Sequence, residues 1–566
     1  MATVHMRTRT PVFIGANTNL GPFEYLVADG FFFRLRIEPI FMLILEKHPD
    51  AAESFEKWIE DCSSKIEQER DNQKLSKLRD AFTLPRFILD KLHDKALAGE
   101  VENAIRTDAR FRRYAMRLES MLGLKKHGAR EHEQRKKQLA CALKTASDEL
   151  YLPGSSIKGM LRTALAWQAI RNADDSLRGN IRRICQWSLQ NERSEKSFAQ
   201  RLETLLFSCK GDDRSDPQYD LLRFVHCGDS STVAPEQGGV VAPVDAYLIN
   251  GNVDPQTPSV ECIDQNIDLT VELRVDVHAI RNIIKRGDGQ QWKRLNEQCV
   301  RHFGLQASII AQAAPLDVEA RAIDAMLGAI REHGRAILQH DADWLQRSSL
   351  SSMINLPQAT PDAAAMTHIG YAGGFHSTTA YLAMLAHADL KDVASGILEK
   401  FHIGLPPRRA RTHNPEPVKL DTFPTSRRLL TLPMRSGQSK GRKAIPLGWV
   451  EMYTEKPAPL PQTDEVRATN YSGVSGSTLA SAAKVTPVKR ISLKAGDTDI
   501  GATVLRNDVK PIIVRLFAEG YEEIDIPCSG ISNLASIPPG SEILVRVNEF
   551  DKKNKRVKSV TFLRNA

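Results

Sequence analysis

The sequence predicts a mixed α+β fold followed by a small β-barrel, and three observations support this. Residues 151–165 and 369–385 each pass from glycines and a hydroxyl residue into an amphipathic run, the pattern of a turn that leads into a helix. Short apolar runs separated by turn residues, typical of strands, lie around both segments. Residues 491–566 contain five further strand-like runs. The two helix starts suggest two related αβ units.

Composition narrows the class of protein. The 566 residues include 77 Lys and Arg against 69 Asp and Glu, a net charge of +8, and 42% are hydrophobic. This length predicts two to four domains with real cores, and the charge fits a polyanionic partner without requiring one. No apolar run approaches the roughly 20 residues of a membrane-spanning helix. The eight cysteines form no CxxC pair. We therefore expect a cytoplasmic protein without membrane segment, metal or cofactor.

The first part of the chain is expected to alternate strands with a helical insertion. Residues 12–14 and 31–37 are strand-like and enclose a turn at 15–21. The segment 39–150 is charged and helical in pattern, and within it residues 108–137 carry ten basic and four acidic residues. Such a stretch can bind a polyanion, although a solvated helix face explains it as well. A mixed region, 151–275, follows.

The second part is expected to begin with helices at 276–340 and to continue with glycine turns, one helix and short strands at 366–452. Residues 456–490 are rich in Pro, Gly and Ser, which is typical of a flexible linker. The five strand-like runs beyond it suggest an OB-like barrel. The predicted boundaries are thus 1–275, 276–455, 456–490 and 491–566. The last hairpin carries five cations, which could bind phosphates or could instead protect an edge strand from aggregation. They are Lys552, Lys553, Lys555, Arg556 and Lys558.

The segment 151–165 is the most informative. Pro153 and Gly154 form a turn, and Ser155 or Ser156 can cap the following helix. Lys158 and Arg162 are four residues apart, so they share one helical face near its start. Free backbone N–H groups with a Lys and an Arg make a competent phosphate site, although an ordinary capped helix has the same spacing. The GxxxxGK[ST] pattern of a nucleotide-binding loop is absent.

Other groups are candidates for RNA contact. Gly373, Gly374, His376 and Ser377 precede the second amphipathic run. Basic turns of the kind that follow a phosphate backbone occur at 406–411, at 427–428 and at 435–443, and surface turns without a ligand are the alternative. The acidic pair 212–213 lies in a polar loop and is best explained as solvated.

The stretch PGSSIKGMLRTAL, residues 153–165, closely resembles the signature of the RAMP proteins of type III CRISPR systems. Further stretches at 10–15, 22–25, 220–230, 373–378, 423–428 and 446–450 follow in the expected order. Together they resemble the family of the fifth Csm subunit, which caps the filament of type III-A (Csm) complexes at the 3′ end of the guide RNA (crRNA). The region 456–566 departs from that family.

The resemblance implies two ferredoxin-like (RRM-type) domains, 1–275 and 276–455, with a helical insertion at about 39–150. It implies binding of the crRNA 3′ region, contact with the backbone RAMP subunit and other Csm subunits, and support of crRNA maturation by a host trimming nuclease in antiviral defence. The residues then expected to contact RNA are Gly154, Ser155, Ser156, Lys158, Gly159, Arg162, Gly373, Gly374, His376, Ser377, Arg427, Arg428, Lys440, Arg442 and Lys443.

Catalysis is the remaining question. Some RAMP proteins cut RNA without metal, and His226, His368 and His376 are the candidates for general acid–base work. Such a histidine must reach the 2′-hydroxyl or the leaving oxygen, beside a cation on the phosphate. No HExxH or HD motif indicates metal hydrolysis. We expect a non-catalytic RNA-binding subunit; a metal-independent ribonuclease and a protein scaffold with incidental basic faces are the alternatives.

Overall fold

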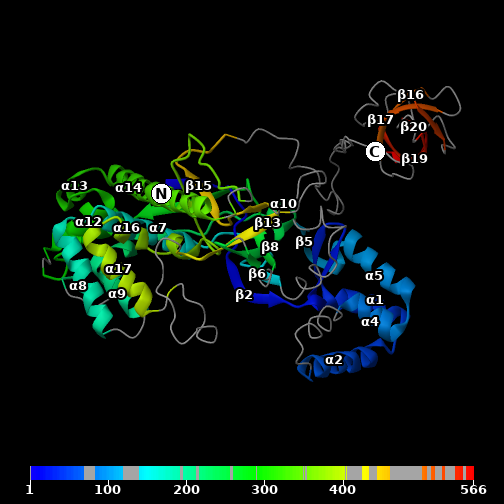
Figure 1. Ribbon diagram of the computed structural model, residues 1–566, viewed down its shortest axis with the longest axis horizontal. Helices are drawn as coiled ribbons and strands as arrows, with labels where there is room; N and C mark the ends of the chain where they lie inside the picture. Colours follow the sequence, from blue (N-terminus) through cyan, green and yellow to red (C-terminus); the bar gives the residue numbers. More distant parts are fainter. Residues whose placement is uncertain are drawn as a thin grey trace. The chain divides into compact units, whose positions relative to one another are not determined.

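The computed structural model divides the chain into two compact units, Met1–Val474 and Ser475–Ala566. Figure 1 shows their helices and strands. The residues described are 2–68, 83–118, 139–191, 195–211, 216–250, 252–254, 259–287, 290–348, 350, 354–401, 403, 423–432, 443–458, 500–506, 512–516, 526–529, 542–551 and 556–565. The predicted linker lies almost wholly outside them.

The first unit contains an antiparallel five-stranded sheet in the order β12-β15-β1-β11-β7. Its strands are β1 (Ala2–Thr8), β7 (Val225–Cys227), β11 (Asp268–Val275), β12 (Ala365–His368) and β15 (Trp449–Tyr453). Helix α7 (Gly154–Arg171) lies between β1 and β7 in the sequence, and α14 (Pro315–Arg347) follows β11. If β12 is left out and the other four strands are numbered along the chain (β1, β7, β11, β15), their order in the sheet is 4-1-3-2. This is the order of the βαββαβ ferredoxin-like arrangement. Strands from both sides of the expected boundary at 275/276 share this one sheet.

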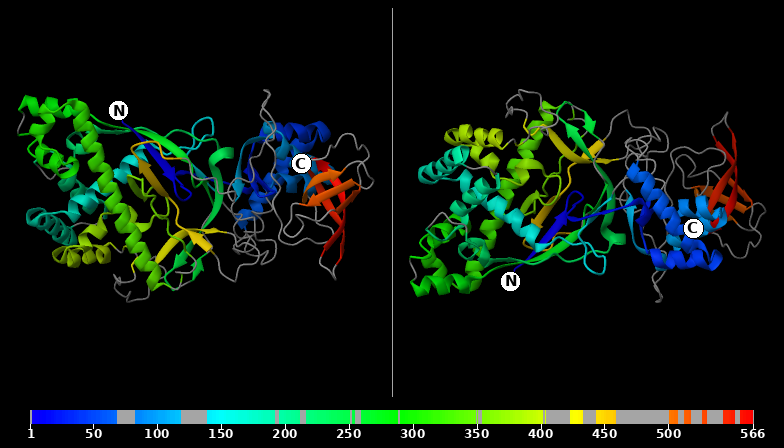
Figure 2. Two further views of the ribbon diagram at one scale, coloured as in Figure 1. Left: turned by 90° about the horizontal axis from the view of Figure 1, so that it is seen from above. Right: turned by 90° about the horizontal axis from the view of Figure 1, so that it is seen from below.

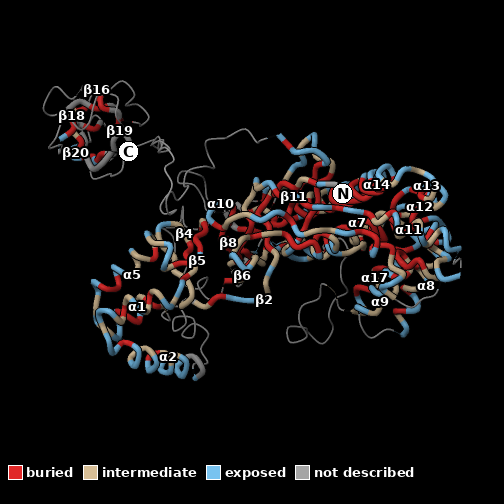
Figure 3. The backbone as a smooth tube through the Cα atoms, turned by 180° about the vertical axis from the view of Figure 1, so that it is seen from behind, coloured by how far each residue is buried: buried red, intermediate tan, exposed pale blue. Residues whose placement is uncertain are grey.

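Alternation along β11 explains which side of the sheet is covered. Leu269, Val271, Leu273 and Val275 are buried, and the residues between them are exposed. A strand with this pattern packs one face on a core and leaves the other in water. Helix α14 contacts both β11 and β12 (Figure 2, green) and packs against α7. Figure 3 shows the buried backbone where these helices meet the sheet.

The second, larger sheet has the strand order β2-β6-β10-β8-β5-β4-β3. It branches at the long strand β8, which also pairs with β9 and β13. Residues 239–243 of β8 pair with β10, and residues 244–248 pair with β13. The fold is therefore mixed α+β with curled sheets. The strands are β2 (Gly15–Leu20), β3 (Tyr25–Ala28), β4 (Phe31–Leu35), β5 (Arg112–Leu118), β6 (Leu139–Ala142), β8 (Gly239–Leu248), β9 (Val253–Asp254), β10 (Ser259–Ile263), β13 (Ser426–Leu432) and β14 (Lys443–Ile445).

The helical insertion is present between β4 and β5 but is shorter than predicted. Its helices are α1 (Ile37–Lys47), α2 (Ala51–Gln68), α4 (Leu84–Phe87), η2 (Ile88–Leu92) and α5 (Lys95–Thr107). Ile40, Trp58 and Phe87 form a separate apolar core with Phe33 of β4. Residues 112–118 and 139–142, predicted as helix, are strands because their backbones pair with β4 and β10. Residues 119–137, the longer part of the basic stretch 108–137, lie outside the described residues.

The opening of the chain also differs from the sequence prediction. Its first strand is β1, at residues 2–8, and Val12 forms only an isolated bridge to Ile263. Residues 15–20, predicted as a turn, form β2 against β6. The predictions differ from the structure because the largely polar segments 2–8 and 15–20 form strands by pairing with segments more than 100 residues away.

The other helices flank α7 and α14. They are α8 (Asp175–Asn191), α9 (Glu195–Phe207), α10 (Pro235–Gly238), α11 (Val277–Arg286), α12 (Leu295–Phe303), α13 (Ala307–Gln312), α15 (Gly374–Ser377), α16 (Tyr381–Leu385) and α17 (Ala388–Lys400). The helices expected at 276–340 are thus found as α11–α14. The single helix expected at 369–385 is two short ones, α15 and α16. In the described part of the chain, no helix is long and apolar enough to cross a membrane.

In the second unit, five strands form a closed barrel in the order β16-β17-β18-β20-β19. Each of them overlaps one of the five strand-like runs of the sequence. Their bounds are β16 (Ile500–Arg506), β17 (Ile512–Leu516), β18 (Ile526–Ser529), β19 (Glu542–Asp551) and β20 (Arg556–Asn565).

Candidate nucleic-acid interface

The start of helix α7 is bound by the segment 220–230. The backbone N–H of Gly154 donates to Asp229 Oδ1 at 2.7 Å, and the N–H of Leu152 donates to Ser230 Oγ at 2.8 Å. Gly154 itself packs directly on the backbone, since a Cβ at this position would overlap Cys227 O and lie 2.7 Å from Gly228 O. The two most distinctive sequence motifs therefore form one structural joint.

Lys158 and Arg162 both have partners in this joint. Lys158 Nζ donates to the carbonyl of Val225, on the edge strand β7, at 2.8 Å. Arg162 Nη2 donates to Asp220 Oδ2 at 2.8 Å, and its guanidinium lies over the Phe207 ring. The structure thus uses both cations to hold 220–230 against α7, and Asp229 occupies the helix N-terminus where a phosphate was expected. The exposed residues here are Ser155 and Gly159; Ser156 is half-buried.

The contact between the segment 220–230 and the start of α7 could not be predicted from the sequence. Each segment carries a recognisable motif, but nothing in either motif indicates that Asp220 and Asp229 face the helix start. The charge of the helix start is the one signal for this contact. Two cations near the positive end of the helix dipole, with no acidic residue in the first turn, favour an acidic side chain from another segment beside them.

Gly154→Ala is expected to lower the free energy of unfolding by about 2–3 kcal/mol, because the added Cβ forces the helix off the backbone at 227–228. Gly159→Ala, in the same helix, is the matched control. A Cβ there meets nothing within 4 Å, so the substitution should raise stability by up to about 1 kcal/mol through helix propensity. Urea unfolding followed by tryptophan fluorescence measures both. Equal effects of the two variants would contradict the close packing of Gly154.

The second glycine segment is a core turn, which corrects the prediction that His376 contacts RNA. His376 is 1% exposed, and its ring lies 4.2 Å from the His340 ring and stacks near Tyr381. Burial lowers its pKa to about 2, so the ring is neutral. Ser377 is also buried and its hydroxyl donates to Gly374 O. A Cβ on Gly373 would overlap the His368 ring, and Gly374 has φ +75°.

The adjacent arginines of β13 point to opposite sides. Arg428 is exposed, with its guanidinium 5.4 Å from the centre of the Tyr371 ring. Arg427 is buried, forms an ion pair with Asp341 of α14 and lies 3.2 Å from His340 Nδ1. The predicted RNA contact by Arg427 is therefore wrong, because strand alternation turns its side chain into the core.

The remaining predicted cations cannot be placed. Lys440 and Arg442 lie outside the described residues, as do the turn 406–411 and the acidic pair 212–213. Lys443 begins β14, but its side chain is not described.

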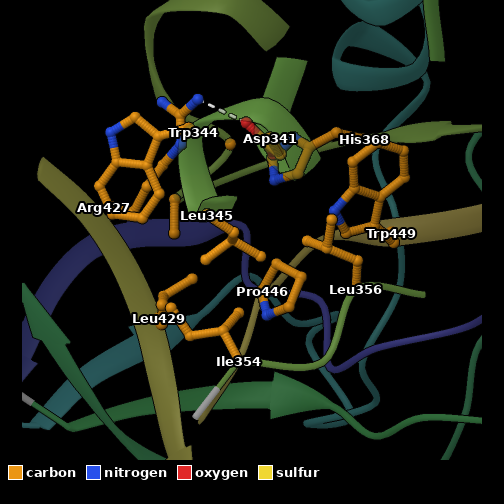
Figure 4. A pocket seen from close by; sticks show the side chains of 12 residues that line it. Asp341, Trp344, Leu345, Ile354, Leu356, His368, Arg427, Leu429, Pro446 and Trp449 are labelled. Carbon is orange, nitrogen blue, oxygen red and sulfur yellow. Dashed lines mark hydrogen bonds and ion pairs between the residues drawn. The ribbon is translucent and has the colours of Figure 1, made fainter. Parts of the chain in front are cut away.

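A small hollow lies beside the Arg427–Asp341 ion pair (Figure 4). Trp344 and Trp449 line it together with His368 and apolar side chains. Its volume of about 20 Å³ is enough for a water molecule and too small for a nucleobase. The hollow is therefore no base-binding site.

Burial also decides which histidines can reach RNA. His368 is buried against Trp449, and burial lowers its pKa to about 4. Because His368 and His376 are both buried, neither ring can reach the backbone of an RNA at the surface. His226 is exposed on β7, where it pairs across from Arg274 of β11. Among the described residues, no three His, Cys, Asp or Glu side chains are grouped to hold a metal ion.

The open face of the five-stranded sheet does not offer a stacking platform on β7 and β11. RRM-type sheets bind RNA by stacking two or three bases on aromatic side chains. The exposed positions of β7 and β11 carry a single aromatic ring, that of His226, together with Asp268, Thr270, Glu272 and Arg274.

A ferredoxin-like sheet covered by a helix that starts at PGSS and is joined to an HCGDS strand end is typical of a RAMP-type protein. The family model of the RAMP superfamily matches residues 5–292, so the chain belongs to that superfamily. No curated protein matches the sequence.

Two solved structures are similar in fold. A chain from a cryo-EM structure of a Csm–crRNA–target RNA ternary complex of a type III-A CRISPR–Cas system is 17% identical, with a TM-score of 0.50, over 80% of this chain and 100% of that one. The crystal structure of T. onnurineus Csm5 is 17% identical, with a TM-score of 0.43, over 79% of this chain and 99% of that one.

Proposed function

We propose that this protein is a non-catalytic RNA-binding subunit of a type III-A Csm complex, the fifth Csm subunit, which binds the crRNA 3′ region and caps the backbone filament. The observation that carries the proposal is the ordered set of RAMP motifs on a fold of which 80% matches a chain of a Csm–crRNA–target RNA complex, and that chain is matched over its whole length. Its partners are then crRNA, the adjacent backbone RAMP subunit and other Csm subunits. It acts in the cytoplasm and supports crRNA maturation by a host trimming nuclease.

The accessible groups favour contact with the RNA backbone. Ser155 and Gly159 are exposed at the start of α7, Arg428 is exposed beside Tyr371, and His226 is exposed beside Arg274. Hydroxyl, backbone and guanidinium groups of this kind bind phosphates with little sequence preference. The buried state of His368 and His376 supports a binding role over metal-independent cleavage.

The test is co-purification of the tagged protein from cells that carry a CRISPR array, followed by sequencing of the bound RNA. Wild type should recover guide RNA with other Csm subunits. Ser155→Glu/Arg428→Glu should recover roughly tenfold less guide RNA, because the added negative charge repels phosphates. Ser155→Glu places an acid at a helix N-terminus, which does not harm folding.

Ser176→Glu/Arg183→Glu is the matched control, with the same change of charge at two exposed positions of α8. It should recover guide RNA as wild type does. Recovery of unrelated RNA by wild type would refute the Csm assignment. Cleavage of bound RNA in EDTA that His226→Ala abolishes would favour the ribonuclease instead, and unchanged guide RNA in both double variants would favour a protein scaffold.

A further inference from the structure

Three segments of the first unit are joined at the backbone of Cys209. The N–H of Cys209 donates to the carbonyl of Tyr219 at 2.7 Å, and the carbonyl of Cys209 accepts from the N–H of Arg294 at 3.1 Å. Cys209 therefore lies beside both the short helix η5 (Pro217–Tyr219) and the start of α12. This junction borders the open sheet, because the next short helix, η6 (Leu221–Phe224), runs directly into β7.

Two aromatic residues meet at this junction and keep part of their surface in water. Tyr219 and Trp292 lie edge to face, with ring centres 5.0 Å apart, and are called here the aromatic pair. Both residues are half-buried, whereas Phe224, whose ring centre is 5.9 Å from that of Trp292, is only 3% exposed. Packing on Phe224 anchors the aromatic pair to the core, so its rings are held in place and still reach the surface.

Cationic side chains surround the aromatic pair. Lys210 Nζ lies 5.0 Å from the centre of the Tyr219 ring. Arg223 is exposed, and its guanidinium donates to a backbone carbonyl of η5. Lys293 is also exposed, and its stem lies against the backbone of Gly211, where an added Cβ would be 3.3 Å from the lysine Cδ. The three cations therefore come from the same three segments that meet at the junction.

The acidic residues of these segments have partners of their own. Asp216 accepts hydrogen bonds from the backbone and side-chain N–H groups of Gln218, and Asp220 accepts from Arg162 of α7. The stretch 212–215, which contains two acids and one arginine, lies outside the described residues. Four basic and two acidic residues occur in the described parts of the three segments, which are 209–211, 216–224 and 290–294. This excess of cations attracts an anionic ligand.

We propose that the aromatic pair stacks an unpaired nucleobase of single-stranded RNA and that Lys210, Arg223 and Lys293 bind the phosphates next to it. Rings and cations side by side suit a single strand, because each of its nucleotides offers a flat base and a phosphate. The site supplies a stacking surface beside β7, whose own exposed face carries only the His226 ring. The proposal rests on the RNA-binding role inferred above and adds to it a site for a base.

The test measures binding of the full-length protein to a fluorescently labelled oligouridylate over a range of salt concentrations. Tyr219→Leu removes a ring and no charge, so affinity should fall about tenfold while the slope of log affinity against log salt stays the same. Lys210→Ala/Lys293→Ala removes two cations and should make that slope shallower by about 1.4. Tyr219→Phe keeps the ring and should bind as wild type does.

Two matched controls separate the site from general effects on the surface. Trp187→Leu removes another accessible ring, since Trp187 of α8 is 42% exposed and has the Arg201 guanidinium 3.9 Å from its ring centre. It should leave the affinity for RNA unchanged. Lys65→Ala/Lys95→Ala removes two cations from exposed positions of the helical insertion and should leave the salt slope unchanged.

Photocrosslinking of the wild-type protein to an oligouridylate that contains thiouridine, followed by peptide mapping, needs no variant and should identify Tyr219 or Trp292. Wild-type affinity in Tyr219→Leu, or crosslinks only at other residues, would overturn this site and leave the RNA-binding role standing. Absence of RNA binding by wild type would refute both. Loss of the other Csm subunits from Tyr219→Leu with unchanged affinity for RNA would assign the aromatic pair to a protein partner instead.

Discussion

Asp341→Ala is expected to lower the free energy of unfolding of the first unit by about 3–5 kcal/mol, because it leaves the buried Arg427 guanidinium without its counter-charge. The Asp341 and Arg427 side chains are 11% and 6% exposed, so bulk water has little access to the guanidinium. The ring of Trp344 lies over the same guanidinium. Urea unfolding followed by tryptophan fluorescence is a suitable measurement, since all six tryptophans precede residue 475 and report on the first unit alone.

Two further variants separate the ion pair from general effects. Arg428→Ala removes the neighbouring, exposed arginine of β13 and should change stability by no more than about 0.5 kcal/mol. Asp341→Leu/Arg427→Met removes both charges together and should be far less damaging than Asp341→Ala, because no unpaired charge remains in the core. A double variant as unstable as Asp341→Ala would show that the shape of the site, and not its charge, determines stability.

Acid should destabilise the first unit strongly between pH 6.5 and pH 4. Burial lowers the pKa of His302, His333 and His368 to about 4 and that of His376 to about 2. In the unfolded chain these rings regain a pKa near 6.5, so in this range the unfolded state binds more protons and stability falls as the pH falls. Each ring contributes a loss of about 2 kcal/mol at pH 5, and four together approach the whole stability of a typical domain.

His302→Phe isolates one of these contributions from the titration of carboxylates. His302 stacks on Phe207 with ring centres 4.7 Å apart, so a phenyl ring suits the site, although the hydrogen bond to Leu206 O is lost. The variant should lose less stability than wild type between pH 7 and pH 5, by about 2 kcal/mol. His278→Phe, at an exposed position of α11, should follow the wild-type pH dependence. Parallel curves for all three proteins would show that His302 is protonated equally in both states.

These contacts change how RNA binding should be tested. Neutralising Lys158 or Arg162, the obvious experiment from the sequence, would remove hydrogen bonds to Val225 and Asp220 that hold the edge strand against α7. A loss of RNA in such a variant would not separate binding from local unfolding. Ser155 and Arg428 avoid this problem because they are exposed and their side chains do not hold that joint together.

Local pattern was enough to predict several features of the chain. The apolar spacing in 157–165 predicts the buried face of α7, and Ile157, Leu161, Ala164 and Leu165 are buried as expected. The helices of 276–340, the five terminal strands and the RAMP motifs were also predictable, because periodicity and short motifs depend on neighbours in sequence.

Tertiary structure decided the rest. The first strand, β1, pairs with β11 and β15, which are more than 250 residues away, so a polar opening segment became the centre of a sheet. Burial of His376 and Arg427 and the capping of α7 by Asp229 likewise depend on segments distant in sequence. Residue type and spacing show that a cation or a histidine is present, but its partners and its distance from water are set by long-range packing, and these determine whether it binds RNA or stabilises the core.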